Sequence, residues 1–142
     1  SGAILMYLAN KTGKLMASSG EAYWQQLQWL MWQMGGLGPM AGQAHHFLKF
    51  NPGKSDYAAK RYGDESKRLY GVLEKQLEGR DYIAGDYSVA DISSWPWISR
   101  FEWQQITIRD YPNVCDWYLR VASRPAVQRG YGVPETLEIP LP

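Results

Sequence analysis

Cysteine is almost absent from this 142-residue chain, which contains a single one, Cys115. One cysteine excludes an internal disulfide framework and favours a reducing compartment. Charge is also scarce: charged residues make up 20% of the chain and the formal net charge is +1. A nearly neutral chain gives no reason to expect nucleic acid or an anionic membrane as a partner.

Long hydrophobic runs are missing as well. The longest run near the start covers residues 3–9, which is too short to cross a bilayer. No basic residue precedes this run and no small-residue cleavage site follows it, so it does not resemble a secretory signal. The sequence therefore predicts a soluble, cytoplasmic domain that does not bind a membrane.

Aromatic residues are plentiful, with seven Trp and ten Tyr, and they indicate a well-packed core. Apolar residues recur every three or four positions along most of the chain, a spacing typical of amphipathic helices. No segment shows the alternation expected of a strand. The fold class is therefore predicted as all-α, a bundle of about five to seven helices. The predicted helices cover residues 1–11, 21–34, 39–50, 55–78, 89–98, 112–121 and 125–127.

Two of these helices carry residues that should disturb them. Three glycines and a proline within residues 35–39 predict a break or a sharp bend after the second helix. Pro96 removes a backbone donor and predicts a bend or a restart inside the fifth helix. The core face of the second helix is expected to follow its apolar spacing, namely Trp24, Leu27, Leu30, Met31 and Met34.

The clearest local signal is the start of the fifth helix. Ser88 is a good N-cap, and Asp91 stands three residues later, where its carboxylate can accept a hydrogen bond from the Ser88 amide. The negative charge also lies at the positive end of the helix dipole. Ser88 and Asp91 are therefore interpreted as structural residues that fix where one core helix begins.

Few residues suggest chemistry. His45 and His46 are neighbours on a predicted helix, where they point about a quarter-turn apart and do not share a metal easily. No metal is expected, and at least one of the two is interpreted as a hydrogen-bonded structural residue. Arg61 and Arg68 lie seven residues apart at the border of an apolar stripe. They form either a solvated basic edge or a clamp for a ligand carboxylate.

Several motifs together resemble the C-terminal helical domain of cytosolic glutathione transferases. They are most similar to the bacterial Nu-class enzymes, which are disulfide-bond reductases, and to the yeast nitrogen-regulator prion protein that shares their fold. The cap motif at residues 88–96 resembles the family's capping box. The other matching segments are residues 1–8, 27–40, 42–47, 61–62, 68–73 and 124–127.

This resemblance implies a glutathione-dependent enzyme that acts as a homodimer on a small disulfide or electrophile, with glutathione as co-substrate. It implies that Ser1 binds the γ-glutamyl end of glutathione and that Arg61 contacts the bound peptide. Weaker candidates for the wall of the cleft are Gln43, His46, Tyr62 and Trp97. The family's thiolate-stabilising Thr or Asn lies in a thioredoxin-like domain, so these residues alone are expected to lack a catalytic group and to be inactive.

The resemblance also implies a division of the chain. Residues 1–14 would be the final helix of an otherwise absent thioredoxin-like domain, residues 15–130 the helical domain, and residues 131–142 an irregular tail. Two alternatives remain open at this point. The chain could come from a non-catalytic relative that serves as a binding or regulatory module. It could also be an unrelated all-α interaction domain, in which case Asp91 would not lie at a buried helix start.

Overall fold

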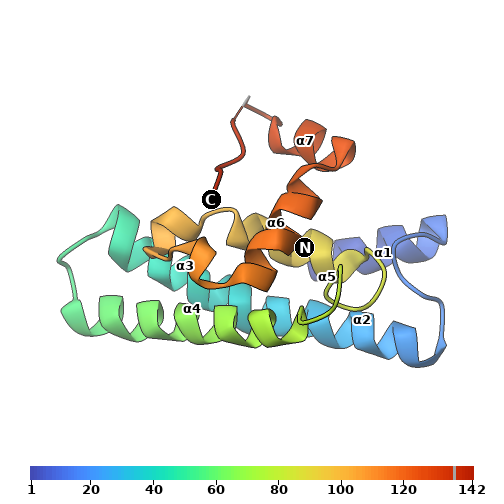
Figure 1. The fold of residues 1–142 in the computed structure, drawn as a ribbon, viewed down its shortest axis with the longest axis horizontal. Helices are drawn as coiled ribbons and strands as arrows, with labels where there is room; N and C mark the ends of the chain where they lie inside the picture. Colours follow the sequence, from blue (N-terminus) through green and yellow to red (C-terminus); the bar gives the residue numbers. More distant parts are fainter. Residues whose placement is uncertain (136) are drawn as a thin grey trace.

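The computed structural model describes residues 1–135 and 137–142 and confirms the all-α fold class. In the described residues, the only strand-like pairing is a bridge between Tyr82 and Gly85. The α-helices, shown in Figure 1, are α1 (Gly2–Thr12), α2 (Gly20–Trp32), α3 (Gly38–Ala44), α4 (Asp56–Gln76), α5 (Val89–Ile98), α6 (Pro112–Ala122) and α7 (Pro125–Tyr131). Between them lie two π-helical segments, η1 (Gln33–Leu37) and η2 (His45–Phe50), and two 3-10 turns, η3 (Phe101–Gln104) and η4 (Ile108–Asp110).

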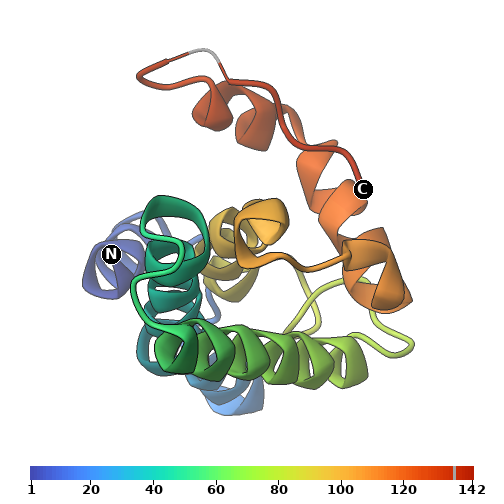
Figure 2. The same ribbon diagram turned by 90° about the vertical axis from the view of Figure 1, so that its left-hand side faces the viewer.

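Helix α5 is the centre of the bundle. It contacts α1, α2, α3 and α6, and seven of its ten residues are buried. Helix α4 packs against α3 and α6 on the other side of the core. Figure 2 shows α7 and the C-terminal tail projecting away from these layers. The tail is still attached to the bundle, because the Tyr118 hydroxyl donates to the Pro140 carbonyl at 2.7 Å and Arg109 donates to the Pro142 carbonyl at 2.7 Å.

Of the predicted break or sharp bend at the glycines, the break does not occur. The backbone stays helical from α2 through η1 and α3 to the end of η2. Residues 33–37 widen into a π-helical turn, and the amide of Gly38 bonds back to the carbonyl of Gln33. Pro39 then falls in the first turn of α3, directly after the π-helical turn. The helix therefore continues through the glycines and the proline by widening into a π-helical turn, although these residues were expected to end it.

The buried face of α2 also differs from the prediction. Leu30 is buried as expected, but Trp24 is 63% exposed and Met31 is 46% exposed. The buried polar residues of this helical stretch are Gln26 and Gln33 instead. Gln26 can be buried because its side-chain oxygen accepts a hydrogen bond from the Ala17 amide at 2.7 Å. The loop before α2 thus selects a face that apolar spacing alone does not identify.

The cap of α5 forms as predicted. The Ser88 hydroxyl accepts a hydrogen bond from the Ala90 amide at 3.3 Å, and the Asp91 carboxylate accepts one from the Ser88 amide at 3.0 Å. Asp91 is fully buried and does more than cap, because its other oxygen accepts bonds from the Ile83 amide at 3.0 Å and the Trp117 indole at 2.8 Å. One carboxylate therefore joins α5, the preceding loop and α6. Helix α5 continues through Pro96 and ends two residues later, so the predicted restart does not occur.

Helix α6 has the predicted buried side, made of Val114, Trp117, Tyr118 and Val121. Its N-terminus has no side-chain cap from the preceding residue. The carboxylate of Glu74 on α4 takes that place, accepting the amides of Asn113 at 3.1 Å and Val114 at 3.0 Å. The start of one helix is therefore satisfied by the side chain of another.

No helix in the described part of the chain is both long enough and apolar enough to span a membrane.

Candidate functional site

The residue expected to bind glutathione, Ser1, lies at the edge of a hollow in the surface. This Ser1 hollow has a volume of 480 Å³, which falls in the range of small-molecule sites. Its lining residues are Ser1 and Leu5 from the start of α1, His45 from η2, Ile92, Ser93, Pro96 and Trp97 from α5, and Arg100 and Trp103 just beyond it. The serine hydroxyl does not cap α1 and lies 3.6 Å from the sulfur of Met34. Its oxygen is exposed and can accept or donate a bond to a ligand.

His45, and not His46, faces this hollow, and its tautomer is fixed by Gln104. The side-chain nitrogen of Gln104 donates to the Trp97 carbonyl at 2.8 Å and lies 3.0 Å from Nε2 of His45. A carbonyl can only accept, so the amide group cannot be turned round, and Nε2 must accept its second hydrogen. The proton of His45 therefore sits on Nδ1. The ring is also held by stacking on Trp97, with centroids 5.9 Å apart.

We expect His45 to stay neutral below the ordinary histidine pKa of about 6.5. Burial lowers the pKa of His45, and the positive charge of Arg100 lowers it further. The unfolded chain then binds this proton first, so the free energy of unfolding should fall as the pH drops from about 6.5 towards the lower pKa of the folded state. Nitrogen-15 NMR of the imidazole checks both the pKa and the Nδ1–H tautomer.

Gln104→Glu provides the control for that measurement. A carboxylate in this place accepts a proton from Nε2 and should raise the pKa of His45. An Nε2–H tautomer in the unmodified protein would contradict the assignment, because two hydrogen-bond donors would then face each other.

Arg61 lies on a different surface. It lines a hollow of 580 Å³ along α4, the Arg61 hollow, together with Met40, Tyr57, Lys60, Tyr62, Asp64, Glu65 and Arg68. Arg68, the second half of the proposed clamp, donates two bonds to the Glu65 carboxylate, both at 2.7 Å. These hydrogen bonds, together with the positive charge of Arg68, lower the pKa of Glu65. Arg61 forms no ion pair with the described residues, so only Arg61 of the two arginines is available to a ligand.

Two of the four candidates for the cleft wall line one of these hollows each, and the other two line neither. Trp97 lines the Ser1 hollow, whereas Tyr62 lines the Arg61 hollow and stacks on Phe47 with a centroid distance of 5.8 Å. Gln43 and His46 are exposed and line neither hollow. The two hollows share no residue. From the sequence, His45 or His46 was a possible lining residue and Arg100 a possible contributor to a cleft, but only the fold places His45 and Arg100 beside Ser1.

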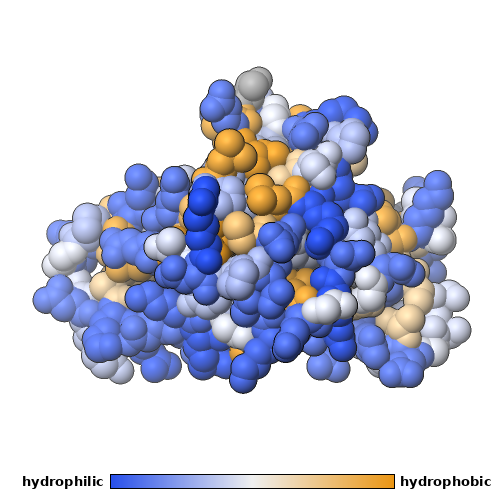
Figure 3. All heavy atoms as spheres, viewed as in Figure 1, coloured by the Kyte–Doolittle hydropathy of each residue, from blue (hydrophilic) through white to orange (hydrophobic). Residues whose placement is uncertain are grey.

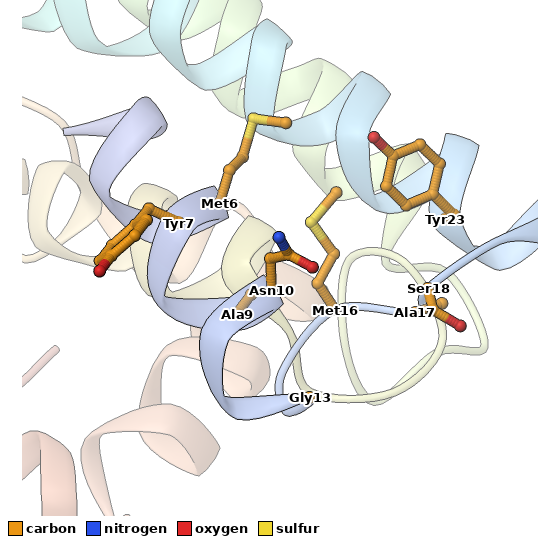
Figure 4. A pocket seen from close by; sticks show the side chains of 9 residues that line it. All are labelled: Met6, Tyr7, Ala9, Asn10, Gly13, Met16, Ala17, Ser18 and Tyr23. Atoms are coloured by element: carbon orange, nitrogen blue, oxygen red, sulfur yellow. The ribbon is translucent and has the colours of Figure 1, made fainter.

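Two further hollows contain none of the predicted site residues. One has a volume of 660 Å³ and lies between α1 and the start of α2, where Met6, Asn10, Met16 and Tyr23 point towards it (Figure 4). The other, the tail hollow, has a volume of 690 Å³ and lies between α5, the end of α6, α7 and the tail. Figure 3 shows hydrophobic side chains gathered on the part of the surface where α7 and the tail project from the bundle. Among the described residues, no three His, Cys, Asp or Glu side chains are grouped so that they could hold a metal ion.

Comparison with known proteins gives a family and close relatives. Residues 37–125 match the model of the family described as "Glutathione S-transferase, C-terminal domain". The chain is 49% identical to the disulfide-bond oxidoreductase YfcG of Escherichia coli over 127 residues, which is 89% of this chain and 59% of that protein. The chain spans about half to three fifths of the length of the curated relatives it matches first.

Solved structures agree with this result. A glutathione transferase from Burkholderia graminis, with two glutathione molecules bound per subunit, matches 94% of this chain and covers 59% of its own length, with a TM-score of 0.86 and 45% identity. Ure2p in complex with glutathione matches 90% of this chain over 63% of its own length, with a TM-score of 0.82 and 36% identity. The expected resemblance to the helical domain of disulfide-reductase-type glutathione transferases is therefore confirmed.

Proposed function

Because this chain belongs to the glutathione S-transferase C-terminal domain family, we propose that it is the helical part of a glutathione-dependent disulfide-bond oxidoreductase. Family membership removes the unrelated interaction domain from consideration. The proposal rests on its similarity to relatives named disulfide-bond oxidoreductases. The observation in the structure that supports it best is that Ser1 and Trp97 line one open hollow. A serine beside an aromatic wall suits a site that holds a peptide next to an apolar substrate.

The reaction uses glutathione as its co-substrate. A glutathione thiolate attacks one sulfur of a disulfide, the sulfur–sulfur bond breaks, and the other sulfur leaves as a thiolate that takes up a proton. In this proposal Ser1 binds the γ-glutamyl end of glutathione, and the Ser1 hollow holds the second substrate close to the thiolate. Reduced glutathione is a cytosolic reductant, and the proposed location is therefore the cytoplasm.

We propose that the thiolate is stabilised from a thioredoxin-like domain of a longer parent protein. Residues 1–14 would be the last helix of that domain, residues 15–130 the helical domain, and residues 131–142 a tail. The 142 residues by themselves would then bind glutathione weakly and would not reduce a disulfide. Expressing the parent protein and measuring glutathione-dependent reduction of hydroxyethyl disulfide tests this proposal.

The separation of Ser1 and Arg61 favours a homodimer. Ser1 and Arg61 line two hollows that share no residue. In a homodimer, Arg61 of a second copy would complete a glutathione site begun by Ser1.

Arg61→Ala in the parent protein is expected to raise the KM for glutathione about tenfold, because a charge-assisted hydrogen bond to a carboxylate is lost. Folding should be unaffected, since Arg61 is exposed and forms no ion pair with the described residues. Steady-state kinetics at varied glutathione concentration provides the measurement.

Arg68→Ala is the matched control, because Arg68 stands on the same helix and lines the same hollow but is occupied by Glu65. We expect its KM for glutathione to remain within about twofold of the unmodified protein. Equal effects of the two variants, or unchanged kinetics in Arg61→Ala, would remove Arg61 from the glutathione site.

The second candidate function is a non-catalytic binding module of the same family. Such a module binds glutathione without reducing a disulfide. Calorimetric binding of glutathione to the parent protein, together with absence of turnover on any disulfide, would support the module over the enzyme.

A further inference from the structure

Arg100 lies at the border between the Ser1 hollow and the tail hollow, lines both, and places a positive charge without a counter-ion there. Its guanidinium carbon lies 4.7 Å from the ring centroid of Trp103 and 5.3 Å from that of Tyr131. Among the described residues it forms no ion pair. Two aromatic rings therefore hold a half-buried guanidinium in position while its charge remains available.

This arrangement suits a carboxylate. A guanidinium that packs on aromatic rings keeps the N–H groups in its own plane free for a bidentate bond to an anion. The walls beside it are largely apolar, with Ile92, Pro96 and Trp97 contributing from α5. Partial exclusion of water by such walls strengthens a charge-assisted hydrogen bond.

His45 adds a neutral ring to the wall of the same hollow. Because Gln104 occupies its Nε2 atom, the proton of the ring is on Nδ1. The ring cannot easily become a second cation beside Arg100. The hollow therefore combines one fixed positive charge, one neutral imidazole ring and an aromatic wall.

We propose that the Ser1 hollow binds a disulfide that carries a carboxylate, with Arg100 binding the carboxylate and the apolar wall contacting the carbon chain. This inference rests on the proposed function, which supplies glutathione as the reductant. One glutathione forms a mixed disulfide with half of the substrate and releases the other half as a thiol. A second glutathione then releases the first half as a thiol and forms glutathione disulfide. Arg100 takes no part in these bond changes and determines which disulfide is bound.

Two probes of the same skeleton separate charge from shape. Dithiodipropionate carries a carboxylate at each end, and its dimethyl ester is neutral. In the parent protein we expect Arg100→Gln to lower kcat/KM for dithiodipropionate about tenfold, mainly through KM, and to leave the ester within about twofold. Arg100→Lys should give an intermediate loss, because it retains the charge without the fork of donors.

Arg124→Gln is the matched control. Arg124 also lies over an aromatic ring, 3.6 Å from the centroid of Tyr87, but lines the tail hollow and not the Ser1 hollow. The Arg124→Gln variant should leave the ratio of kcat/KM for dithiodipropionate to kcat/KM for its dimethyl ester unchanged. An unchanged ratio in Arg100→Gln, or an equal loss for both probes in a variant whose thermal unfolding is normal, would overturn the proposal.

Binding measured without glutathione separates this inference from the proposed function. If neither probe is turned over by the unmodified parent protein, the proposed function fails. Calorimetry with dithiodipropionate still tests whether Arg100 binds the carboxylate. Weaker binding in Arg100→Gln than in Arg124→Gln supports the proposal, and equal binding in both variants overturns it.

Discussion

Replacing Asp91 with alanine is expected to lower the free energy of unfolding by about 3–5 kcal/mol. The sequence alone suggests only a lost helix cap, worth about 1–2 kcal/mol. The structure adds two buried donors, the Ile83 amide and the Trp117 indole, that would lose their acceptor together with the Ser88 amide. A buried donor without a partner costs about 1–3 kcal/mol. Chemical denaturation of the 142-residue chain measures the loss.

Asp56→Ala is the control, because Asp56 also lies in the first turn of a helix but is exposed. We expect it to cost less than about 1 kcal/mol. Similar losses for the two variants would mean that Asp91 acts only through the helix dipole. If Asp91→Ala in the parent protein lowered glutathione affinity without lowering stability, Asp91 would belong to the site instead.

Asp91→Asn tests the charge of this buried group. Burial raises the pKa of Asp91, while hydrogen bonds from Ile83, Trp117 and Ser88 oppose that rise. A raised pKa in the folded state contributes stability below the unfolded value of about 3.9, and this contribution is lost as the pH rises through the folded value. The stability difference between the unmodified protein and Asp91→Asn should therefore shift in favour of the unmodified protein as the pH falls from 7 towards 4.

Gly38→Ala is expected to have the second large effect. Overpacking should lower the free energy of unfolding by about 1–3 kcal/mol. A Cβ atom at Gly38 would lie 2.6 Å from the side-chain nitrogen of Gln33 and 3.3 Å from the ring of Trp97. Gln33 is buried, and its backbone carbonyl oxygen would also lie only 3.2 Å from the new Cβ atom. The indole signal of Trp97 should therefore move in NMR spectra, because the ring forms part of the Ser1 hollow.

Gly35→Ala is the matched control three residues earlier. Nothing lies within 4 Å of a Cβ atom at Gly35, and this residue is exposed. Alanine in a helical position reduces the freedom of the unfolded chain and should stabilise the protein by about 0.5–1 kcal/mol. We therefore expect the free energy of unfolding to fall in Gly38→Ala and to rise in Gly35→Ala. A loss of stability in Gly35→Ala would contradict the open, helical environment that the structure gives Gly35.

The parts of the fold that could be predicted from the sequence are those encoded locally. Ser88 and Asp91 are three residues apart, and their spacing is enough to place the start of α5. The buried side of α6 follows from regular spacing around Trp117. By contrast, Trp24 is exposed and Gln26 is buried, because a loop amide that is not adjacent in sequence pairs with the glutamine.

The candidate site was predictable only where the resemblance to a family supplied it. Trp97 was expected at the cleft, and the structure places it beside Ser1. Arg100 and His45 carry no local signal, because their roles depend on Trp103, which follows α5, and on Gln104, which lies 59 residues from His45. The glutathione-binding roles of Ser1 and Arg61 remain predictions.

The Glu74 carboxylate at the start of α6 has a consequence for cooperativity. The first amides of α6 find their acceptor only when α4 is already folded and in place. Helix α6 therefore cannot open at its N-terminus without releasing Glu74, and α4 cannot fray there without exposing those amides. Hydrogen exchange should find the two helices protected as one unit, although 35 residues separate them in the sequence.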